Sequence, residues 1–175
     1  NGAIHMKQNL QVILMKTSPR LHVFEGKISD LTGKLNDYLH SGMLMRQLDA
    51  ERMKTVDSFY DELCQVLELP EYFGRNLNAL DECITDLDWL PIGGPILLLI
   101  EKSEMLLSDA SKDLFEGFMS VLNDAGKEWS RPVDKGEDWD RPGLPFHVIF
   151  QVDSNMREQF ETKLKKCSVQ IGEIE

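Results

Sequence analysis

The feature that most restricts the fold of this chain is an uninterrupted apolar run at residues 96–100, which follows Gly94 and Pro95. The run has no polar residue at alternate positions, so a strand formed here has no face that suits water. It is also far shorter than the roughly 20 apolar residues that a membrane-spanning helix needs. We therefore expect a central strand of a parallel sheet, covered by other elements on both faces.

The other apolar patterns place helices and strands in alternation around this strand. Thr55 and Asn76 are suited to be helix N-caps, and Gly126 is expected to close a long helix. A polar segment with two Arg-Pro pairs, residues 127–145, predicts a long loop. The expected strands are residues 10–15, 21–24, 43–47, 96–100 and 145–152, and the expected helices begin near Ser29, Thr55, Asn76, Ser103, Leu114 and Ser154. This order predicts an α/β fold with a small, parallel sheet flanked by helices.

The most distinctive segment is residues 69–84, where two neighbouring aromatic residues lie between a proline and a glycine. Pro70 ends the preceding helix, and Gly74 is expected to supply a backbone angle that other residues resist. Apolar residues at helical spacing follow Asn76, which leaves the acidic side chains of this helix on another face. A short aromatic loop that leads into a helix with an acidic outer face suits the binding of a basic partner.

The run LPEYFGRNLNALDECITD in this segment resembles the central motif of the barstar family, intracellular protein inhibitors of secreted ribonucleases. The order Pro-Glu-aromatic-aromatic-Gly followed by Asn-Leu-x-Ala-Leu is more specific than a turn requires. The resemblance covers about residues 43–152 and implies the barstar-like three-layer fold for them. It divides the chain into an N-terminal ββα-like extension (1–42, with Met6 as a candidate natural start), a barstar-like domain (43–152) and a C-terminal helix and tail (153–175).

The resemblance also implies which residues bind a partner. Tyr72 matches the contact tyrosine of the family, and Glu82 falls at the principal helix carboxylate. Two positions depart from the best-known member: Asn78 replaces a carboxylate, and Asp81 replaces a tryptophan. The predicted partner-binding residues are Tyr72, Phe73, Arg75, Asn76, Asn78, Asp81, Glu82, Thr85, Asp86 and Asp88.

A carboxylate that the resemblance implies late in the long helix has no direct match, because Val121 falls at its position. Asp124 and Glu116 are the acidic neighbours that can replace it. The negative charge of the site is therefore expected to be redistributed, which predicts a similar role toward a different partner.

Several of these residues also have purely structural interpretations. Phe73 suits the core, Tyr72 suits the core and the surface equally, and Asn76 suits a helix cap. Arg75 can pair with Glu71 or Asp81 within the chain. The long loop contains two tryptophans, Trp129 and Trp139. Each can pack the loop against the protein or anchor a partner.

The charge of the chain fits a basic partner better than a nucleic acid. There are 30 acidic and 19 basic residues, so the formal net charge is −11. Such a surface repels phosphate groups and attracts basic proteins, although a high charge can also serve solubility alone.

Features that would indicate an enzyme are scarce in this sequence. The histidines, His5, His22, His40 and His147, are scattered, and Cys64, Cys83 and Cys167 lack the spacing of metal ligands. Phosphate-binding glycine loops and the HExxH, CxxC and GxSxG patterns do not occur. We expect no catalysis, cofactor or metal, and consider a small α/β hydrolase the weakest alternative.

These observations predict a bacterial immunity protein that binds a basic ribonuclease toxin and blocks its active site. No basic-then-apolar signal segment opens the sequence, so we expect it to act in the cytoplasm. The alternative is a non-inhibitory interaction module that uses the same fold as a scaffold and self-associates through the N-terminal extension. The cognate toxin and the oligomeric state stay open.

Overall fold

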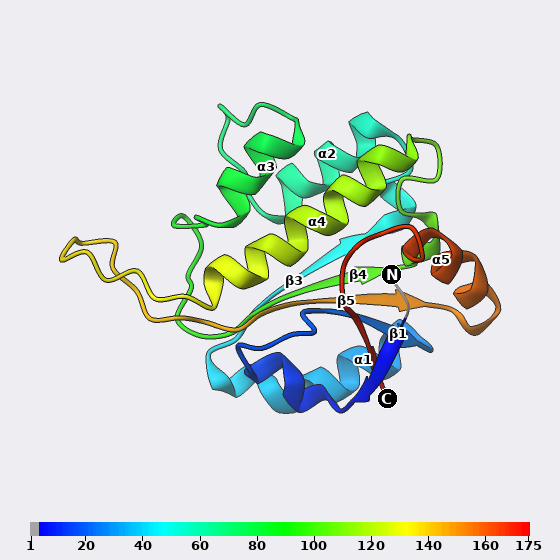
Figure 1. The fold of residues 1–175 in the computed structure, drawn as a ribbon, viewed down its shortest axis with the longest axis horizontal. Coiled ribbons are helices and arrows are strands. Elements are labelled where there is room, and N and C mark those ends of the chain that lie inside the picture. Colours follow the sequence, from blue (N-terminus) through cyan, green and yellow to red (C-terminus); the bar gives the residue numbers. More distant parts are fainter. Residues whose placement is uncertain (1–3) are drawn as a thin grey trace.

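The computed structural model describes the backbone of residues 4–175 and the side chains of residues 7–39 and 42–175. The side chains of His5, His40 and the candidate start Met6 lie outside this description. Figure 1 shows one sheet with helices above and below it. All strand pairs are parallel, and the six strands have the order β1-β6-β2-β5-β4-β3. The strands are β1 (Ile4–Gln8), β2 (Leu21–Glu25), β3 (Leu44–Asp49), β4 (Ile96–Glu101), β5 (Phe146–Val152) and β6 (Ile171–Ile174). This confirms the predicted α/β class and the parallel sheet.

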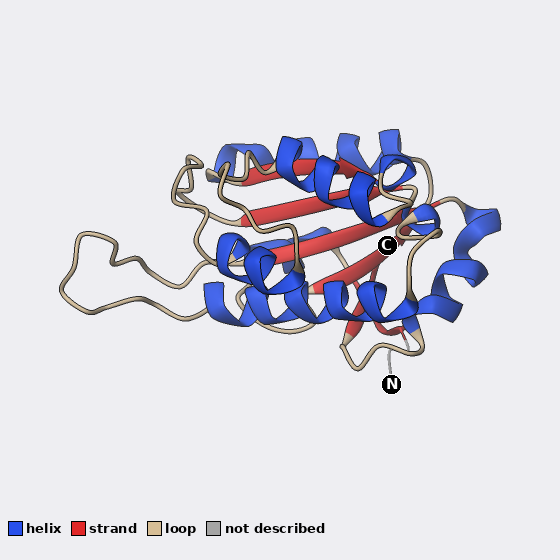
Figure 2. Cartoon of the chain, turned by 90° about the horizontal axis from the view of Figure 1, so that it is seen from above, coloured by secondary structure: helices blue, strands red, loops and turns tan. Residues whose placement is uncertain are grey.

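Helices cover both faces of the sheet (Figures 1 and 2). One face carries α2 (Val56–Val66), α3 (Leu77–Ile84), α4 (Lys112–Trp129) and, at one end, α5 (Arg157–Leu164). The other face carries the 3-10 helix η1 (Leu10–Leu14), α1 (Ile28–Leu35) and η2 (Asn36–Ser41). Short 3-10 turns complete the chain: η3 (Ala50–Arg52), η4 (Ser103–Met105) and η5 (Ser154–Met156). Within residues 4–175, no helix is both long and apolar enough to cross a membrane.

Strand β4 is buried on both faces, as its apolar run predicts. Ile96, Leu98 and Ile100 belong to the core beneath α2, α3 and α4. Leu97 and Leu99 belong to a second core, which η1 and α1 fill from the opposite face. Residues 10–35 therefore supply the second layer that the central strand requires.

The N-terminal segment is tied to β5 by a buried pair of histidines. His147 donates from Nε2 to the carbonyl of Met15 at 2.7 Å, because a carbonyl can only accept. Its Nδ1 therefore accepts from His22 Nε2 at 2.9 Å, and His22 Nδ1 is left as a buried acceptor with no partner. Burial lowers the pKa of His22 to about 3 and that of His147 to about 4. Both rings are thus neutral in the folded protein.

Three sequence-based predictions about the first and last parts of the chain were wrong. In place of the strand expected at residues 10–15, Leu10–Leu14 form η1, and Asn9 caps it by accepting from the amide of Gln11 at 2.9 Å. Strands β1 and β6 were not predicted. The helix expected from Ser29 has Lys27 as its N-cap residue.

Gly126 does not close the long helix, because α4 continues to Trp129. A Cβ atom at this position would clash with the side chain of Arg20, which directly precedes β2 and packs against α4 here. Gly126 therefore serves close packing inside α4 rather than a change of direction at its end.

The histidine pair predicts that the protein loses stability in acid. In the unfolded chain, the two histidine rings take up protons below the ordinary histidine pKa of about 6.5. In the folded protein, the same rings take up protons only near pH 3 to 4. Stability from this pair is complete above pH 6.5 and falls as the pH drops toward 4, by roughly 2 kcal/mol per ring at about pH 5. Urea denaturation at about pH 7 and about pH 5 measures the loss.

A double variant, His22→Leu with His147→Leu, is the control for this prediction. It removes both titrating rings from the same buried position, so its stability should change much less between the two pH values. An equal change in wild type and variant would contradict the assignment.

Candidate functional site

The segment between α2 and α3, residues 67–76, forms a turn that presents the two aromatic residues of the motif. Helix α2 ends before Pro70, since Glu68 adopts φ 52° and the amide of Leu69 donates to the carbonyl of Cys64 at 3.1 Å. This is a Schellman-type helix end. Trp89 then fastens the turn, because its indole N–H donates to the carbonyl of Leu67 at 2.9 Å.

Arg75 holds the other end of this turn against α2. Its Nη2 atom lies 3.0 Å from Asp61 Oδ1 and donates to the carbonyl of Asp57 at 3.0 Å. The partner is therefore Asp61, not either of the two acidic residues expected from the sequence. Arg75 itself has the left-handed φ of 50°, whereas Gly74, the residue expected to adopt it, does not.

The two aromatic residues point in opposite directions. Phe73 is buried, with its ring centre 5.8 Å from that of Tyr60, which confirms the core interpretation. Tyr72 is 82% exposed. Of the pair, only Tyr72 has its ring open to solvent.

Helix α3 is fixed to α4 at both of its ends. At its start, Asn76 accepts from the amide of Ala79 at 2.9 Å, which confirms the predicted N-cap. Leu77 packs where Gly117 of α4 has no side chain, so the two helices approach closely. At its end, the indole of Trp129 donates to the free carbonyl of Ile84 at 2.8 Å.

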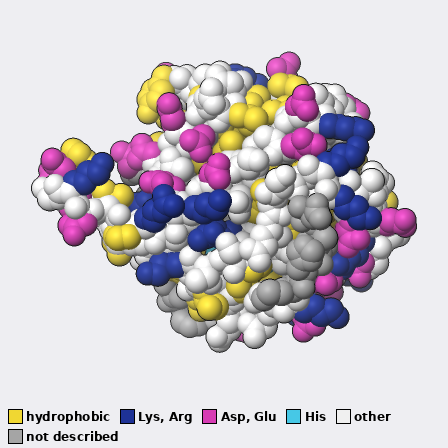
Figure 3. Space-filling model, in the orientation of Figure 1, with side chains coloured by type: hydrophobic (Ala, Val, Ile, Leu, Met, Phe, Trp, Pro, Cys, Tyr) yellow, Lys and Arg dark blue, Asp and Glu magenta, His cyan; other side chains and the backbone are white. Residues whose placement is uncertain are grey.

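A groove of about 790 Å³ lies between the end of α3, the end of α4 and the long loop at residues 130–145. Five carboxylates line it, and we call it the acidic groove: Asp81, Asp86, Asp88, Asp124 and Glu128. Its apolar wall includes Leu90, Trp129 and Leu144. Figure 3 shows acidic side chains gathered over α3 and the adjoining end of α4, with a group of Lys and Arg below them.

The carboxylates of the acidic groove are close enough to affect one another. Burial raises the pKa of Asp81, and so do neighbouring negative charges, first among them Asp124. Burial also raises the pKa of Asp86, followed by the charge of Asp88. A cation in the groove would relieve this repulsion, so the site favours a positively charged group.

The loop that walls the acidic groove has its own internal structure. Val133 and Arg141 exchange two backbone hydrogen bonds of 2.9 Å, and Asp140 accepts from three successive amides at the tip, residues 135–137. Arg141 lies 4.2 Å from the ring centre of Trp129. The loop projects from the body of the molecule (Figures 1 and 2), and Trp139 is 65% exposed on it. Trp129 thus packs the loop, and Trp139 is open to solvent.

The predicted partner-binding residues separate into three groups. Phe73, Arg75 and Asn76 build the turn and the helix start. Asp81 and Thr85 are half-buried at the groove, and the rest are exposed: Tyr72, Asn78, Glu82, Asp86 and Asp88. Their role in binding stays a prediction.

Glu128 is a groove residue that the sequence reasoning missed. Asp124 and Glu128 lie four residues apart on α4, so they share one face of that helix, and this spacing was the available signal. Of the two neighbours proposed for the late-helix carboxylate, Asp124 lines the groove, while Glu116 lines a different pocket near the start of α4. Val121 is half-buried.

The residues that line the acidic groove suit contact with basic side chains. Among the described residues, no group of three or more His, Cys, Asp or Glu side chains is arranged to hold a metal ion. The groove combines five carboxylates with apolar contact area, and this combination fits arginine and lysine side chains. Two of the five have distant ion-pair partners on the protein surface, Lys127 at 4.0 Å from Asp124 and Arg131 at 3.9 Å from Glu128.

Comparison with known proteins supports the resemblance seen in the motif. The family model described as Barstar (barnase inhibitor) matches residues 43–151. The Bacillus subtilis (strain 168) protein named "Putative ribonuclease inhibitor YrdF" is 31% identical over 84 residues, which are 46% of this chain and 84% of that protein. The predicted family resemblance is thereby confirmed.

Solved structures share the fold at low sequence identity. The Aeropyrum pernix ORC2 protein in its ADP form has a TM-score of 0.53 at 10% identity, over 94% of this chain and 44% of that chain. Cdc6p from Pyrobaculum aerophilum has a TM-score of 0.50 at 12% identity, over 87% of this chain and 38% of that chain. This chain spans less than half the length of either, and the likeness concerns the fold alone.

Truncation of the two aromatic residues should have very unequal effects on stability. Phe73→Ala removes a buried ring and should lower the free energy of unfolding by about 3 kcal/mol. Tyr72→Ala should change it by less than about 0.5 kcal/mol, because the ring is exposed. Chemical denaturation of both variants measures this difference, and a large loss for Tyr72→Ala would show that the ring supports the fold.

Proposed function

Because the chain belongs to the barstar family, we propose that it inhibits a basic ribonuclease by occupying its active site with the acidic groove and Tyr72. In this proposal, the ribonuclease is a bacterial toxin, and the protein acts in the cytoplasm of the cell that makes it. The protein blocks the toxin by binding and catalyses no reaction itself. The observation that carries it is the gathering of five carboxylates between α3, α4 and the loop. The exposed Tyr72 lies in the turn that leads into α3.

The chemistry of a ribonuclease active site explains why this surface suits it. Such a site must hold phosphate, so it is lined with basic side chains. Carboxylates that are held on two packed helices can occupy the phosphate positions with little loss of freedom, and an exposed ring can take the place of a base. The opposite charges also accelerate the encounter of the two proteins.

The close packing of α3 against α4 holds the carboxylates of the acidic groove on a rigid base. Asn76 caps α3, Trp129 binds its last carbonyl, and Leu77 fits against Gly117 of α4. Asp81 and Asp124 therefore belong to one packed unit. This rigidity favours tight binding, because few side chains must be ordered when the partner arrives.

The alternative of self-association through the N-terminal extension has less support from the sheet. Strand β2 has neighbours on both sides, β5 and β6. Of the two extension strands, only β1 lies at an edge, where a second copy could add a strand. The acidic groove lies in the layer of α3 and α4, away from the β1 edge. Mutations can therefore test partner binding by the groove separately from self-association through β1.

Neutralising the outer face of α3 should weaken inhibition without unfolding the protein. The double variant Asp81→Asn with Glu82→Gln removes two charges from this face. We expect it to bind a purified barnase-type ribonuclease at least about 30-fold more weakly, or about 2 kcal/mol. Calorimetry and inhibition of RNA cleavage measure the effect, and association by the wild type should slow as salt increases.

The matched control is Asp30→Asn with Asp37→Asn, which changes the net charge equally on the opposite face of the sheet. Both residues are exposed, and this variant should inhibit like the wild type. Equal weakening by the two double variants would show that overall charge, not the groove, drives binding. Failure of the wild type to bind basic ribonucleases would overturn the proposal.

A further inference from the structure

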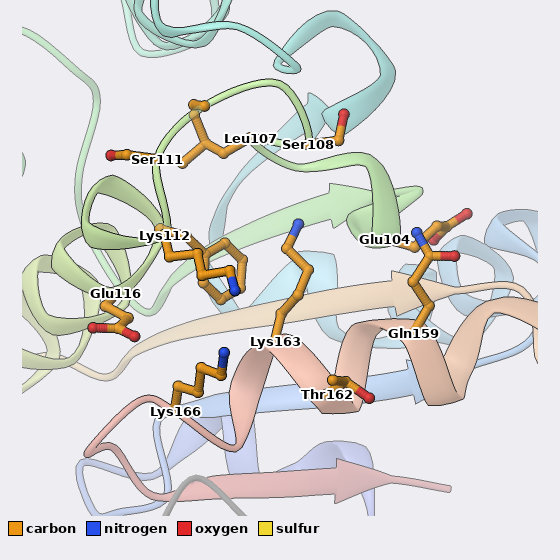
Figure 4. A pocket seen from close by; sticks show the side chains of 12 residues that line it. Glu104, Leu107, Ser108, Ser111, Lys112, Glu116, Gln159, Thr162, Lys163 and Lys166 are labelled. Carbon is orange, nitrogen blue, oxygen red and sulfur yellow. The ribbon is translucent and has the colours of Figure 1, made fainter.

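A second pocket lies at the other end of α4, between η4, the first turns of α4 and helix α5 (Figure 4). Its volume is about 280 Å³, near the lower limit of small-molecule sites. The first and last residues of α4 are about 25 Å apart at 1.5 Å per residue, so this pocket is remote from the acidic groove. A ligand held here would be independent of the proposed nuclease partner.

Three ammonium groups converge on this pocket in a strongly acidic protein. Lys112 comes from the start of α4, Lys163 from the last turn of α5, and Lys166 from the turn that follows α5. In Figure 4, the nitrogen ends of Lys112 and Lys166 point toward one another, whereas Glu116 is turned away from them. The close side-chain contact with Lys112, followed by its charge, lowers the pKa of Lys166, and the charge of Glu116 acts in the opposite direction.

Acidic side chains offset these positive charges only in part, with Glu116 near Lys166 and Glu104 near Lys163. None of the ion pairs between described residues includes any of the three lysines. Lys163 is held in place by donating to the carbonyl of Leu106 at 2.5 Å, with Nζ 4.7 Å from the ring centre of Phe115. An anion between Lys112 and Lys166 would remove their mutual repulsion.

A second, independent feature of the pocket is an unpartnered buried carboxylate oxygen. Glu104 is only 4% exposed, and its Oε2 atom has no hydrogen-bond partner among the described residues. In Figure 4, Glu104 and Gln159 lie beyond Lys163, at the opposite end of the pocket from Lys112 and Lys166. A buried acceptor without a donor is costly, and a ligand hydroxyl group would satisfy it.

We propose that this pocket binds a small organic phosphate of about the size of a pentose phosphate. The phosphate would lie between Lys112 and Lys166, close to the positive end of α4, and a sugar hydroxyl would donate to Glu104 Oε2. A phosphate monoester carries close to two negative charges at neutral pH, which suits a pair of ammonium groups better than a carboxylate does. The small volume of the pocket excludes a longer nucleic acid segment.

Nuclear magnetic resonance titration of the full chain with ribose 5-phosphate tests this proposal. We expect saturable shifts of the backbone amides in residues 112–116 and 163–167. Inorganic phosphate should bind about fivefold more weakly, and ribose should not bind measurably, because each offers half of the contacts. Absence of saturable shifts with ribose 5-phosphate, or equal affinity for inorganic phosphate, would overturn the proposal.

Two adjacent lysines provide a matched pair of variants. Lys166→Ala should weaken ribose 5-phosphate binding about tenfold, whereas Lys165→Ala, which removes the same charge outside the pocket lining, should change it less than about twofold. Equal losses in both variants would show a general charge effect and contradict the site.

A Glu104→Leu variant tests the sugar end separately from the phosphate end. It should reduce the affinity for ribose 5-phosphate to that for inorganic phosphate and leave inorganic phosphate binding unchanged. Retention of the full ribose 5-phosphate affinity would exclude the assigned role of Glu104. The amide spectrum of each variant reports whether it is folded.

Discussion

Strand β4 buries both of its faces, and this demands a layer of helices on each side of the sheet. The family-matched segment supplies α2, α3 and α4 on one face. Residues 10–35 supply the layer on the other face, and β2 extends the same sheet by pairing with β5. The N-terminal segment is therefore a structural complement of the central strands, and the groove on the far side depends on the support that it gives.

Local signals in the sequence were sufficient for the elements that carry the acidic groove. Thr55 and Asn76 are caps whose side chains bond to amides three residues away, so their role is visible in a short window. The continuous apolar run of β4 indicated two-sided burial for the same reason. The strand prediction for residues 10–15 failed because a short segment of mostly apolar residues fits a buried helical turn as well as a strand.

Strands β1 and β6 could not be predicted from their own residues. Each is only four or five residues long, and the strands that pair with it lie more than a hundred residues away in the sequence. At the site, α3 was readable, but the contribution of Asp124 and Glu128 depended on how α4 packs against it. That packing follows from Gly117 and Leu77, a contact that no pattern within one helix reveals.

The position of β6 between β1 and β2 has a consequence for synthesis of the protein. Strands β3, β4 and β5 can pair as soon as residue 152 has left the ribosome, and the helices that form the acidic groove precede that point. Strand β1 has no neighbour until residues 171–174 emerge and enter the gap, where the amide of Glu175 also donates to the carbonyl of Gln8 at 3.1 Å. The strand order therefore allows a nascent chain to assemble the acidic groove first and to close the opposite edge of its sheet afterwards.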